Sequence, residues 1–324
     1  MKSGKIFINL ILVVVAGLLL IIIFSSRNGA ATKIIKGVVN NTETSGREMY
    51  ASTLLNHFDG EPTWNPQTEN NTYSQPLIAG QAGMLVELNS GDILFSKNAD
   101  ERRPIASLVK IMTTVVALEH KNIDSKVFIT LDAAHVGENS MGISSGETYT
   151  LEELLYGMIL HSGNDAAYAI AEVVAGDSDR FVDWMNFKAE ELGLQNTYFA
   201  DPSGLDDGSY STSADLVKLT RYAMKNPEFR KIVGTVEKEI FSTDEHKYIY
   251  LYNQTNLLTT YPGVAGVKTG FTEEAGLSLV TYAANGGKEV VGVVLNSIDR
   301  KGDMILMLDH GFETLGINVG HGLL

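Results

Sequence analysis

The spacing of hydrophobic residues divides the chain into three regions. An apolar run extends from Ile6 to Phe24 and is interrupted only by Asn9. Between residues 25 and 75 the chain is rich in Asn, Thr, Ser, Gly and Pro, a composition typical of a solvated linker. Periodic hydrophobic residues begin directly after it. The pattern predicts an N-terminal segment at 1–24, a flexible linker at 25–75 and a folded domain at 76–324.

The apolar run has the length of a membrane-spanning helix. As an α-helix it would be roughly 28 Å long, close to the thickness of the hydrocarbon core of a bilayer. A cleavable signal peptide has a shorter apolar region of about 7–15 residues, followed by small residues such as Gly29-Ala30-Ala31 here. The length of the run and Arg27 favour an uncleaved transmembrane anchor, with a cleaved signal peptide as the alternative and a buried soluble helix as a third reading.

In the folded domain, strand-like patterns stand at both ends and helical patterns stand between them. Thr150 and Glu153 form a capping box that predicts the start of a helix, and the turn at 161–163 separates this helix from the next one. This order predicts an α+β fold with an antiparallel sheet built from both chain ends and a central helical subdomain. The predicted strands are 84–88, 93–95, 266–271, 277–283 and 289–296, and the predicted helices are 107–120, 151–160, 164–174, 179–192 and 213–225.

Composition excludes several classes of function. The chain has 25 Lys and Arg against 39 Asp and Glu, a formal charge of −14, which argues against nucleic acid as a partner. It has no cysteine, so disulfides, thiolate zinc sites and a cysteine nucleophile are excluded. The histidines show no ligand spacing such as H-E-x-x-H, and we expect neither a metal nor a cofactor.

The first candidate for chemistry is Ser107 with Lys110. Three residues apart at the start of a helix, both side chains project from one face. A serine hydroxyl needs a neighbouring base, and a lysine can be that base only when burial lowers its pKa. The spacing alone also fits a surface lysine, but Lys110 stands among Val109, Ile111 and Met112.

Two further groups of polar residues follow along the chain. Ser162 and Asn164 stand at a helix break, where both residue types also serve as simple caps. The triplet Lys268-Thr269-Gly270 stands on a predicted strand, where it also fits an ordinary strand end. Each group is unspecific by itself, but their combination in this order is far more specific.

The combination S-x-x-K, S-x-N and K-T-G resembles the motif set of penicillin-recognising serine enzymes. Within them the chain is most similar to low-molecular-mass penicillin-binding proteins of the serine D-alanyl-D-alanine carboxypeptidase family, in the β-lactamase/transpeptidase-like superfamily. The blocks SMGISSGETYTLEELLYGMILHSGNDAA, FADPSGLDDGSYSTSADL and GVAGVKTGFTEEAGLSLV carry the resemblance beyond the motifs. It implies an enzyme that removes the terminal D-alanine from peptidoglycan stem pentapeptides and is acylated by β-lactams.

The resemblance also implies a role for each site residue. Ser107 would be the acylated nucleophile and Lys110 its base, while Ser162 would relay a proton to the leaving amine. Asn164 would orient Lys110 and bind the substrate backbone. Lys268, Thr269 and Gly270 would hold the terminal carboxylate of the substrate. The backbone N–H groups of Ser107 and Phe271 would form the oxyanion hole.

Alternatives stay open within this superfamily. Similar enzymes without a further C-terminal domain include DD-endopeptidases that cleave cross-links. A β-lactamase would need an additional carboxylate, for which the loop 201–207 is a candidate. The sequence Gly142-x-Ser144-x-Gly146 formally matches a hydrolase elbow, but a polar loop precedes it and no helix follows at once. We expect a monomer, anchored by its N-terminal helix, with its catalytic domain outside the cytoplasm.

Overall fold

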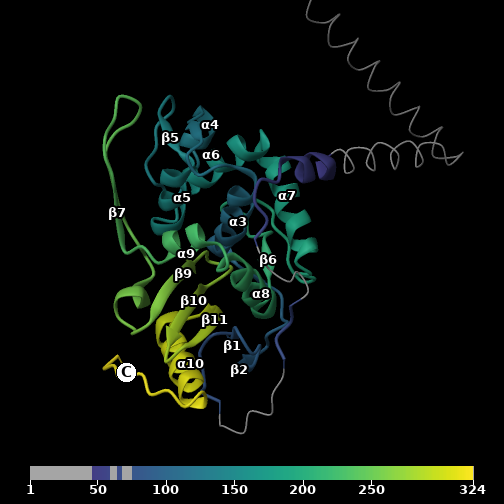
Figure 1. The fold of residues 1–324 in the computed structure, drawn as a ribbon, viewed down its shortest axis with the longest axis vertical. Coiled ribbons are helices and arrows are strands. Elements are labelled where there is room, and N and C mark those ends of the chain that lie inside the picture. Colours follow the sequence, from purple (N-terminus) through teal and green to yellow (C-terminus); the bar gives the residue numbers. More distant parts are fainter. Residues whose placement is uncertain (1–45, 59–63, 68–74, 324) are drawn as a thin grey trace, which may run out of the picture. The chain divides into compact units, whose positions relative to one another are not determined.

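Five antiparallel strands from both ends of the folded region form the central sheet, in the order β2-β1-β11-β10-β9. The computed structural model describes residues 46–58, 64–67 and 75–323. The described strands of this sheet are β1 (Ala82–Glu87), β2 (Ile93–Lys97), β9 (Val264–Gly270), β10 (Leu277–Asn285) and β11 (Lys288–Ser297) (Figure 1). The chain divides into two compact units at residues 52 and 53, and the sheet belongs to the second unit.

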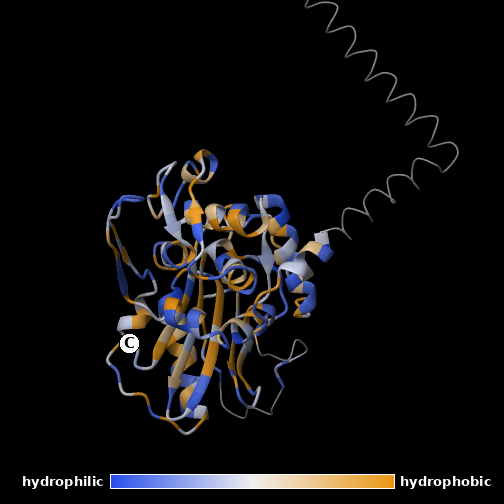
Figure 2. Ribbon diagram, turned by 45° about the horizontal axis from the view of Figure 1, so that its top comes forward, coloured by the Kyte–Doolittle hydropathy of each residue, from blue (hydrophilic) through white to orange (hydrophobic). Residues whose placement is uncertain are grey.

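Helices cover both faces of the sheet. Every residue of β1 is buried, which requires cover on both sides. Helix α10 (Arg300–Thr314) shares one hydrophobic core with the sheet, in which Met304 and Leu308 pack with Leu85 and Val294. Helix α8 (Ser213–Ala223) contacts β1 and β11 on the other face. Hydrophobic residues accordingly run along the central strands in Figure 2.

A helical subdomain is inserted between β2 and β9. Its central helix, α3 (Lys110–His120), is buried at every position and contacts α5, α6, α7 and α8. The remaining elements between β2 and β9 are β3 (Arg103–Pro104), η1 (Ala106–Val109), β4 (Lys126–Phe128), α4 (Leu131–Ala134), β5 (Thr148–Thr150), α5 (Leu151–Leu160), α6 (Asn164–Ala175), α7 (Ser178–Glu191), β6 (Tyr210–Ser211), α9 (Pro227–Val233), β7 (Glu237–Ile240), β8 (Ile249–Tyr252) and η2 (Asn256–Thr259).

The α+β fold with strands from both chain ends is confirmed, and the capping box of Thr150 and Glu153 is present. The helix predicted from Ser107 differs at its start, because a 3₁₀ turn precedes α3 there. Helix α10 is missing from the sequence prediction, although its N-cap Asp299, which accepts a hydrogen bond from the N–H of Gly302, is a sequence signal.

Part of the segment predicted to be a linker belongs to the second unit. The N–H groups of Leu55 and Asn56 both donate to the carbonyl oxygen of Glu119. The side-chain amide of Asn56 donates to the backbone carbonyl oxygen of Leu118. These bonds satisfy carbonyl groups at the C-terminal end of α3, which have no partner within the helix. The division of the chain into three regions stays a prediction.

The predicted transmembrane run lies outside the described residues. Among the helices that the structure does describe, none combines the length and the apolar character needed to cross a bilayer.

Candidate active site

Ser107 and Lys110 meet at the start of α3. Lys110 is fully buried, and its Nζ lies 3.0 Å from Ser107 Oγ, 2.8 Å from Asn164 Oδ1 and 2.6 Å from the carbonyl oxygen of Ser203. The amide of Asn164 is oriented by its Nδ2, which donates to the carbonyl of Gly137. Its Oδ1 and the Ser203 carbonyl can only accept. When Lys110 is neutral, its two N–H groups therefore donate to these two oxygens. Its lone pair is then free to accept the hydroxyl proton of Ser107.

Burial makes the neutral form of Lys110 accessible. Removal from water lowers the pKa of Lys110 to about 7, against the opposing effects of the carboxylates of Asp201, Asp165 and Glu138. At neutral pH a large share of the molecules therefore holds an unprotonated amine beside Ser107. This is the condition under which a lysine can take the proton of a serine hydroxyl.

Asn164 is held in place by a loop that Asp165 organises. Asp165 is fully buried at the start of α6. The backbone N–H of Asn164 donates to the carbonyl of Asn139, and its side chain donates to Gly137 in the same loop. The carboxylate of Asp165 accepts the loop's donors, which are the hydroxyl of Ser140 and the N–H groups of Met141, Gly142 and Ile143.

A second loop supplies the Ser203 carbonyl. The buried Asp201 holds this loop together by hydrogen bonds, although the sequence suggests the loop 201–207 only as a source of a catalytic carboxylate. Gly204 has φ +78°, and a Cβ at this position would lie 1.9 Å from the carbonyl oxygen of Ala106, so only glycine allows the close approach to η1. The carboxylate of Asp201 accepts the hydroxyl of Ser203 and the N–H groups of Ser203, Gly204, Leu205 and Asp206.

Ser162 pairs with Lys268 across the site. Lys268 Nζ donates to Ser162 Oγ at 3.1 Å and to the carbonyl of Thr269 at 2.9 Å, and both partners of the first bond are buried. Burial lowers the pKa of Lys268 well below its ordinary value, and the positive charges of Lys110 and Arg300 lower it further. An ammonium group with a lowered pKa is a ready proton donor to the hydroxyl that it contacts.

The backbone has an uncommon conformation at Ser162 and directly before Ser107. Ala106, which precedes Ser107, has φ +47°, and Ser162 itself has φ +59°. Residues with a side chain rarely adopt positive φ, and such strain concentrates at functional sites. The surrounding structure therefore holds Ser162, and the residue before Ser107, in uncommon backbone conformations.

The last strand residue, Gly270, brings β9 against η1. A Cβ at Gly270 would lie 2.9 Å from the carbonyl oxygen of Ile105 and 3.3 Å from Leu108 Cγ. The carbonyl of Gly270 accepts a hydrogen bond from the guanidinium of Arg300 at 2.9 Å. Phe271 follows directly and is 55% exposed at the end of the strand.

Six of the eight predicted site residues form two hydrogen-bonded groups, and Gly270 and Phe271 stand at the end of β9 outside them. Ser107, Lys110 and Asn164 make the first group, and Ser162, Lys268 and Thr269 make the second. Asp165, the Ser203 carbonyl and Arg300 also belong to the site but are not predicted from the motifs. Only Asp165 leaves a signal, as an acidic residue in the first turn of a helix that begins at a predicted site residue.

The described residues contain no group of three or more His, Asp or Glu side chains placed to hold a metal ion.

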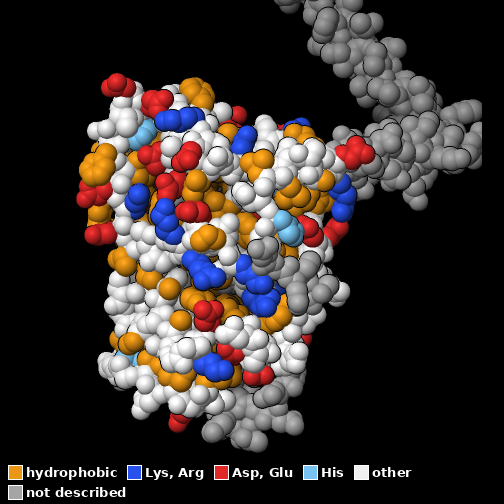
Figure 3. Space-filling view, viewed as in Figure 1, with side chains coloured by type: hydrophobic (Ala, Val, Ile, Leu, Met, Phe, Trp, Pro, Cys, Tyr) orange, Lys and Arg blue, Asp and Glu red, His pale blue; other side chains and the backbone are white. Residues whose placement is uncertain are grey.

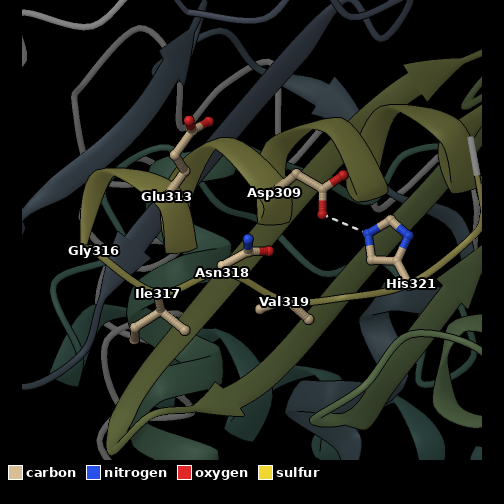
Figure 4. A pocket seen from close by; sticks show the side chains of 7 residues that line it. All are labelled: Asp309, Glu313, Gly316, Ile317, Asn318, Val319 and His321. Carbon is tan, nitrogen blue, oxygen red and sulfur yellow. Dashed lines mark hydrogen bonds and ion pairs between the residues drawn. The ribbon is translucent and has the colours of Figure 1, made fainter.

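A cavity of about 570 Å³ lies beside the C-terminal end of α10 (Figure 4). Its Asp309 accepts hydrogen bonds from Tyr261 and His321. None of the predicted catalytic residues lines this cavity.

Comparison with known proteins places the chain among relatives of one kind. It is 36% identical over 242 residues to the D-alanyl-D-alanine carboxypeptidase DacF of Bacillus subtilis, a match that covers 72% of this chain but only 62% of that protein. It is also 36% identical to the D-alanyl-D-alanine carboxypeptidase of Streptomyces sp. strain K15, over 74% of this chain and 89% of the relative.

Solved structures agree with these relatives. The crystal structure of the Streptomyces K15 DD-transpeptidase matches with a TM-score of 0.71 at 35% identity, covering 74% of this chain and all of that chain. The D-alanyl-D-alanine carboxypeptidase of Mycobacterium tuberculosis H37Rv matches with a TM-score of 0.71 at 33% identity. The match covers 76% of this chain and 96% of that chain. The family model described as D-alanyl-D-alanine carboxypeptidase matches residues 69–299, which is more than half of the sequence. The chain therefore belongs to the peptidase S11 family of D-alanyl-D-alanine carboxypeptidases.

Proposed function

We propose that the protein is a serine-type D-Ala-D-Ala carboxypeptidase that removes the terminal D-alanine from peptidoglycan stem pentapeptides. The observation that carries the proposal is the geometry at Lys110, because the carbonyl oxygens of Asn164 and Ser203 leave the lone pair of a neutral amine for Ser107. The named relatives are D-alanyl-D-alanine carboxypeptidases. Penicillins would acylate the same serine.

The reaction begins with attack by Ser107. Its Oγ forms a bond to the carbonyl carbon of the penultimate D-alanine while its proton passes to Lys110 Nζ, 3.0 Å away. The backbone N–H groups of Ser107 and Phe271 stabilise the negative charge on the carbonyl oxygen. Asn164 orients Lys110 and donates to the substrate backbone.

Departure of D-alanine uses the second group of residues. As the peptide bond breaks, Ser162 gives its hydroxyl proton to the leaving amine and is reprotonated by Lys268, 3.1 Å away. Water then attacks the ester carbon and passes a proton through Ser162 to Lys268. The bond between that carbon and Ser107 Oγ breaks, Lys110 returns its proton to Ser107 Oγ, and the shortened stem peptide leaves with a new carboxyl end. The cycle needs no cofactor.

Recognition of a free C-terminus is assigned to the end of β9. Lys268, Thr269 and Gly270 bind the terminal carboxylate, with a charge-assisted bond from the lysine. The guanidinium of Arg300, on the carbonyl of Gly270, adds positive charge next to this position. A substrate with an anionic end is thereby favoured over an internal peptide bond.

The test measures D-alanine release from a pentapeptide ending in D-Ala-D-Ala, with the full chain. The variant Ser107→Ala should lose release and should no longer be labelled by a fluorescent penicillin. The variant Ser144→Ala is the matched control, because Ser144 belongs to the formal hydrolase-elbow sequence and is exposed; it should keep both activities. Release that persists in Ser107→Ala refutes the proposal.

Two outcomes would redirect the assignment within the family. A folded protein that is acylated by penicillin, releases no D-alanine and cleaves a cross-linked peptide dimer is a DD-endopeptidase. Rapid turnover of the penicillin itself would indicate a β-lactamase. That outcome is not expected, because the buried carboxylate of Asp201 is occupied by hydrogen bonds from its own loop.

The location of the enzyme follows from its substrate. Residues 6–24 serve as a single-pass anchor, and the catalytic domain, working as a monomer, acts on the wall outside the cytoplasm. The length and composition of the N-terminal run support the anchor. Deleting residues 1–24 should move the protein from the membrane fraction to the soluble fraction, and an unchanged distribution would contradict the anchor.

A further inference from the structure

The hairpin of β7 and β8 exposes a row of aromatic side chains. Phe241, Tyr248, Tyr250 and Tyr252 are each between 45% and 69% exposed. Because successive side chains of a strand point to opposite faces, Tyr250 and Tyr252 share one face of β8, and Tyr248, directly before the strand, continues the same alternation. The three tyrosines form a row roughly 13 Å long. Between them, Ile249 and Leu251 are buried on the other face. An exposed apolar row of this kind marks a binding surface.

Two carboxylates flank the tyrosines on this face. Glu237 pairs directly with Tyr252 and Glu239 with Tyr250 in the antiparallel register, so their side chains lie on the same side. The hydroxyl of Tyr250 donates to Glu237. In Figure 3 hydrophobic and acidic side chains alternate along the edge of the molecule that the hairpin occupies. We name this face, with its three tyrosines and two glutamates, the tyrosine face.

The hairpin is held at both ends, so the tyrosine face is formed in advance. Near its tip, the carbonyl of Glu245 accepts the N–H of Thr148, and its carboxylate pairs with Lys126 at 2.6 Å. At its base, the N–H of Gln254 donates to the carbonyl of Leu160. A surface that needs no reordering loses less entropy when it binds a ligand.

The tyrosine face begins next to the proposed active site. The ring of Tyr252 packs edge-on against His161, with ring centroids 4.9 Å apart. His161 directly precedes Ser162, whose hydroxyl contacts Lys268. A ligand that continues from the active site along the hairpin would therefore pass over Tyr252 and Tyr250.

We propose that the tyrosine face is a subsite for the glycan strand to which the stem peptide is attached, an inference that rests on the proposed function. The apolar faces of pyranose rings stack on tyrosine rings, and sugar hydroxyl and acetamido N–H groups donate to carboxylates. The charges of Glu237 and Glu239 disfavour an anionic polymer or a second acidic stem peptide. A neutral saccharide is the wall component whose chemistry fits this surface.

The experiment compares two substrates of the full chain. One is the free pentapeptide and the other is the same pentapeptide linked to a wall disaccharide. The variant Tyr250→Ala should lower kcat/KM for the sugar-linked substrate by roughly fivefold to tenfold, the effect of truncating an aromatic anchor. It should leave kcat/KM for the free pentapeptide unchanged. The variant Tyr250→Trp, which keeps an aromatic ring, should have the wild-type kcat/KM for the sugar-linked substrate.

The matched control is Tyr198→Ala, because Tyr198 is 46% exposed but contacts Tyr210 rather than the hairpin. It should affect neither substrate. Equal losses on both substrates, or no loss on the sugar-linked one, would overturn the glycan subsite and leave the tyrosine face to a protein partner.

A second readout separates this inference from the proposed function. Peptide-free glycan chains should bind the wild-type protein in a calorimetric titration, and Tyr250→Ala should weaken that binding by the same factor. Wild-type protein that releases D-alanine from both substrates but does not bind these chains refutes the subsite alone. Wild-type protein that releases D-alanine from neither substrate refutes the proposed function, while glycan binding still decides the subsite.

Discussion

Replacing Asp201 with asparagine removes one negative charge near Lys110 without changing the size of the side chain. The carboxylate reaches Lys110 through a single residue, because Ser203 donates its N–H to Asp201 at 3.0 Å and accepts Lys110 Nζ with its carbonyl at 2.6 Å. The Asp201 charge raises the pKa of Lys110 against the larger, opposite effect of burial. Its removal should therefore lower that pKa further.

The size of the shift follows from the separation of the charges. Two hydrogen bonds and one intervening residue place the ammonium and the carboxylate roughly 7 Å apart. With an effective dielectric constant of about 20, their interaction is roughly 2 kcal/mol, which corresponds to between one and two pKa units. The pKa of Lys110 should fall from about 7 in the wild type to roughly 5.5 in Asp201→Asn.

The assay is the pH dependence of Ser107 acylation by a fluorescent penicillin. Because the base must be neutral, the rate should rise with pH through the pKa of Lys110 and then level off. The midpoint should lie near pH 7 in the wild type and at lower pH in Asp201→Asn. Thermal unfolding must confirm a folded variant, since four N–H groups of the loop lose their charged acceptor and only one neutral oxygen remains for them.

The matched control is Asp206→Asn, which removes the same charge from an exposed position of the same loop. Solvent screens this charge, so the midpoint should stay close to that of the wild type. A folded Asp201→Asn protein with an unchanged midpoint would show that the titrating group is not Lys110, and the assignment of the base would be wrong.

Three further predictions concern the lysines and one glycine of the site. Lys268→Ala should lower kcat/KM for D-alanine release by about 1.5–3 kcal/mol, roughly ten- to a hundredfold, and an unchanged value would argue against its role at the carboxylate. The pKa of Lys110 in the folded protein lies below its ordinary value of 10.5, so the unfolded chain binds more protons than the folded one between about pH 7 and pH 10. Urea unfolding should therefore show a higher free energy of unfolding at pH 9 than at pH 7. The variant Lys110→Met should show a smaller rise. Gly204→Ala should slow acylation by roughly a hundredfold because the new methyl group would displace the backbone at Ala106. Gly193→Ala, also at positive φ but with open space around it, should acylate at the wild-type rate.

Local features of the sequence predict the strands of the central sheet, most of the long helices and the candidate residues, but not α10. The capping box at Thr150 and Glu153 specifies where α5 begins, because both hydrogen bonds form between residues three apart. Alternating and continuous apolar runs likewise predict the strands that form the central sheet. The three motifs name Ser107, Lys110 and Lys268 because residue type and order are properties of the chain alone.

Only the tertiary structure decides how these residues act. The lone pair of Lys110 is left for Ser107 because two acceptors, Asn164 and the carbonyl of Ser203, occupy its hydrogens from elements that are 54 and 93 residues away. No local pattern encodes that distance, or the burial that lowers the pKa of Lys110. The tyrosine face has the same origin, since alternation predicts that Tyr250 and Tyr252 share a side, but packing against His161 decides that this side begins at the active site. Sequence order determines which groups are available, and the long-range contacts of the folded chain determine their protonation and direction.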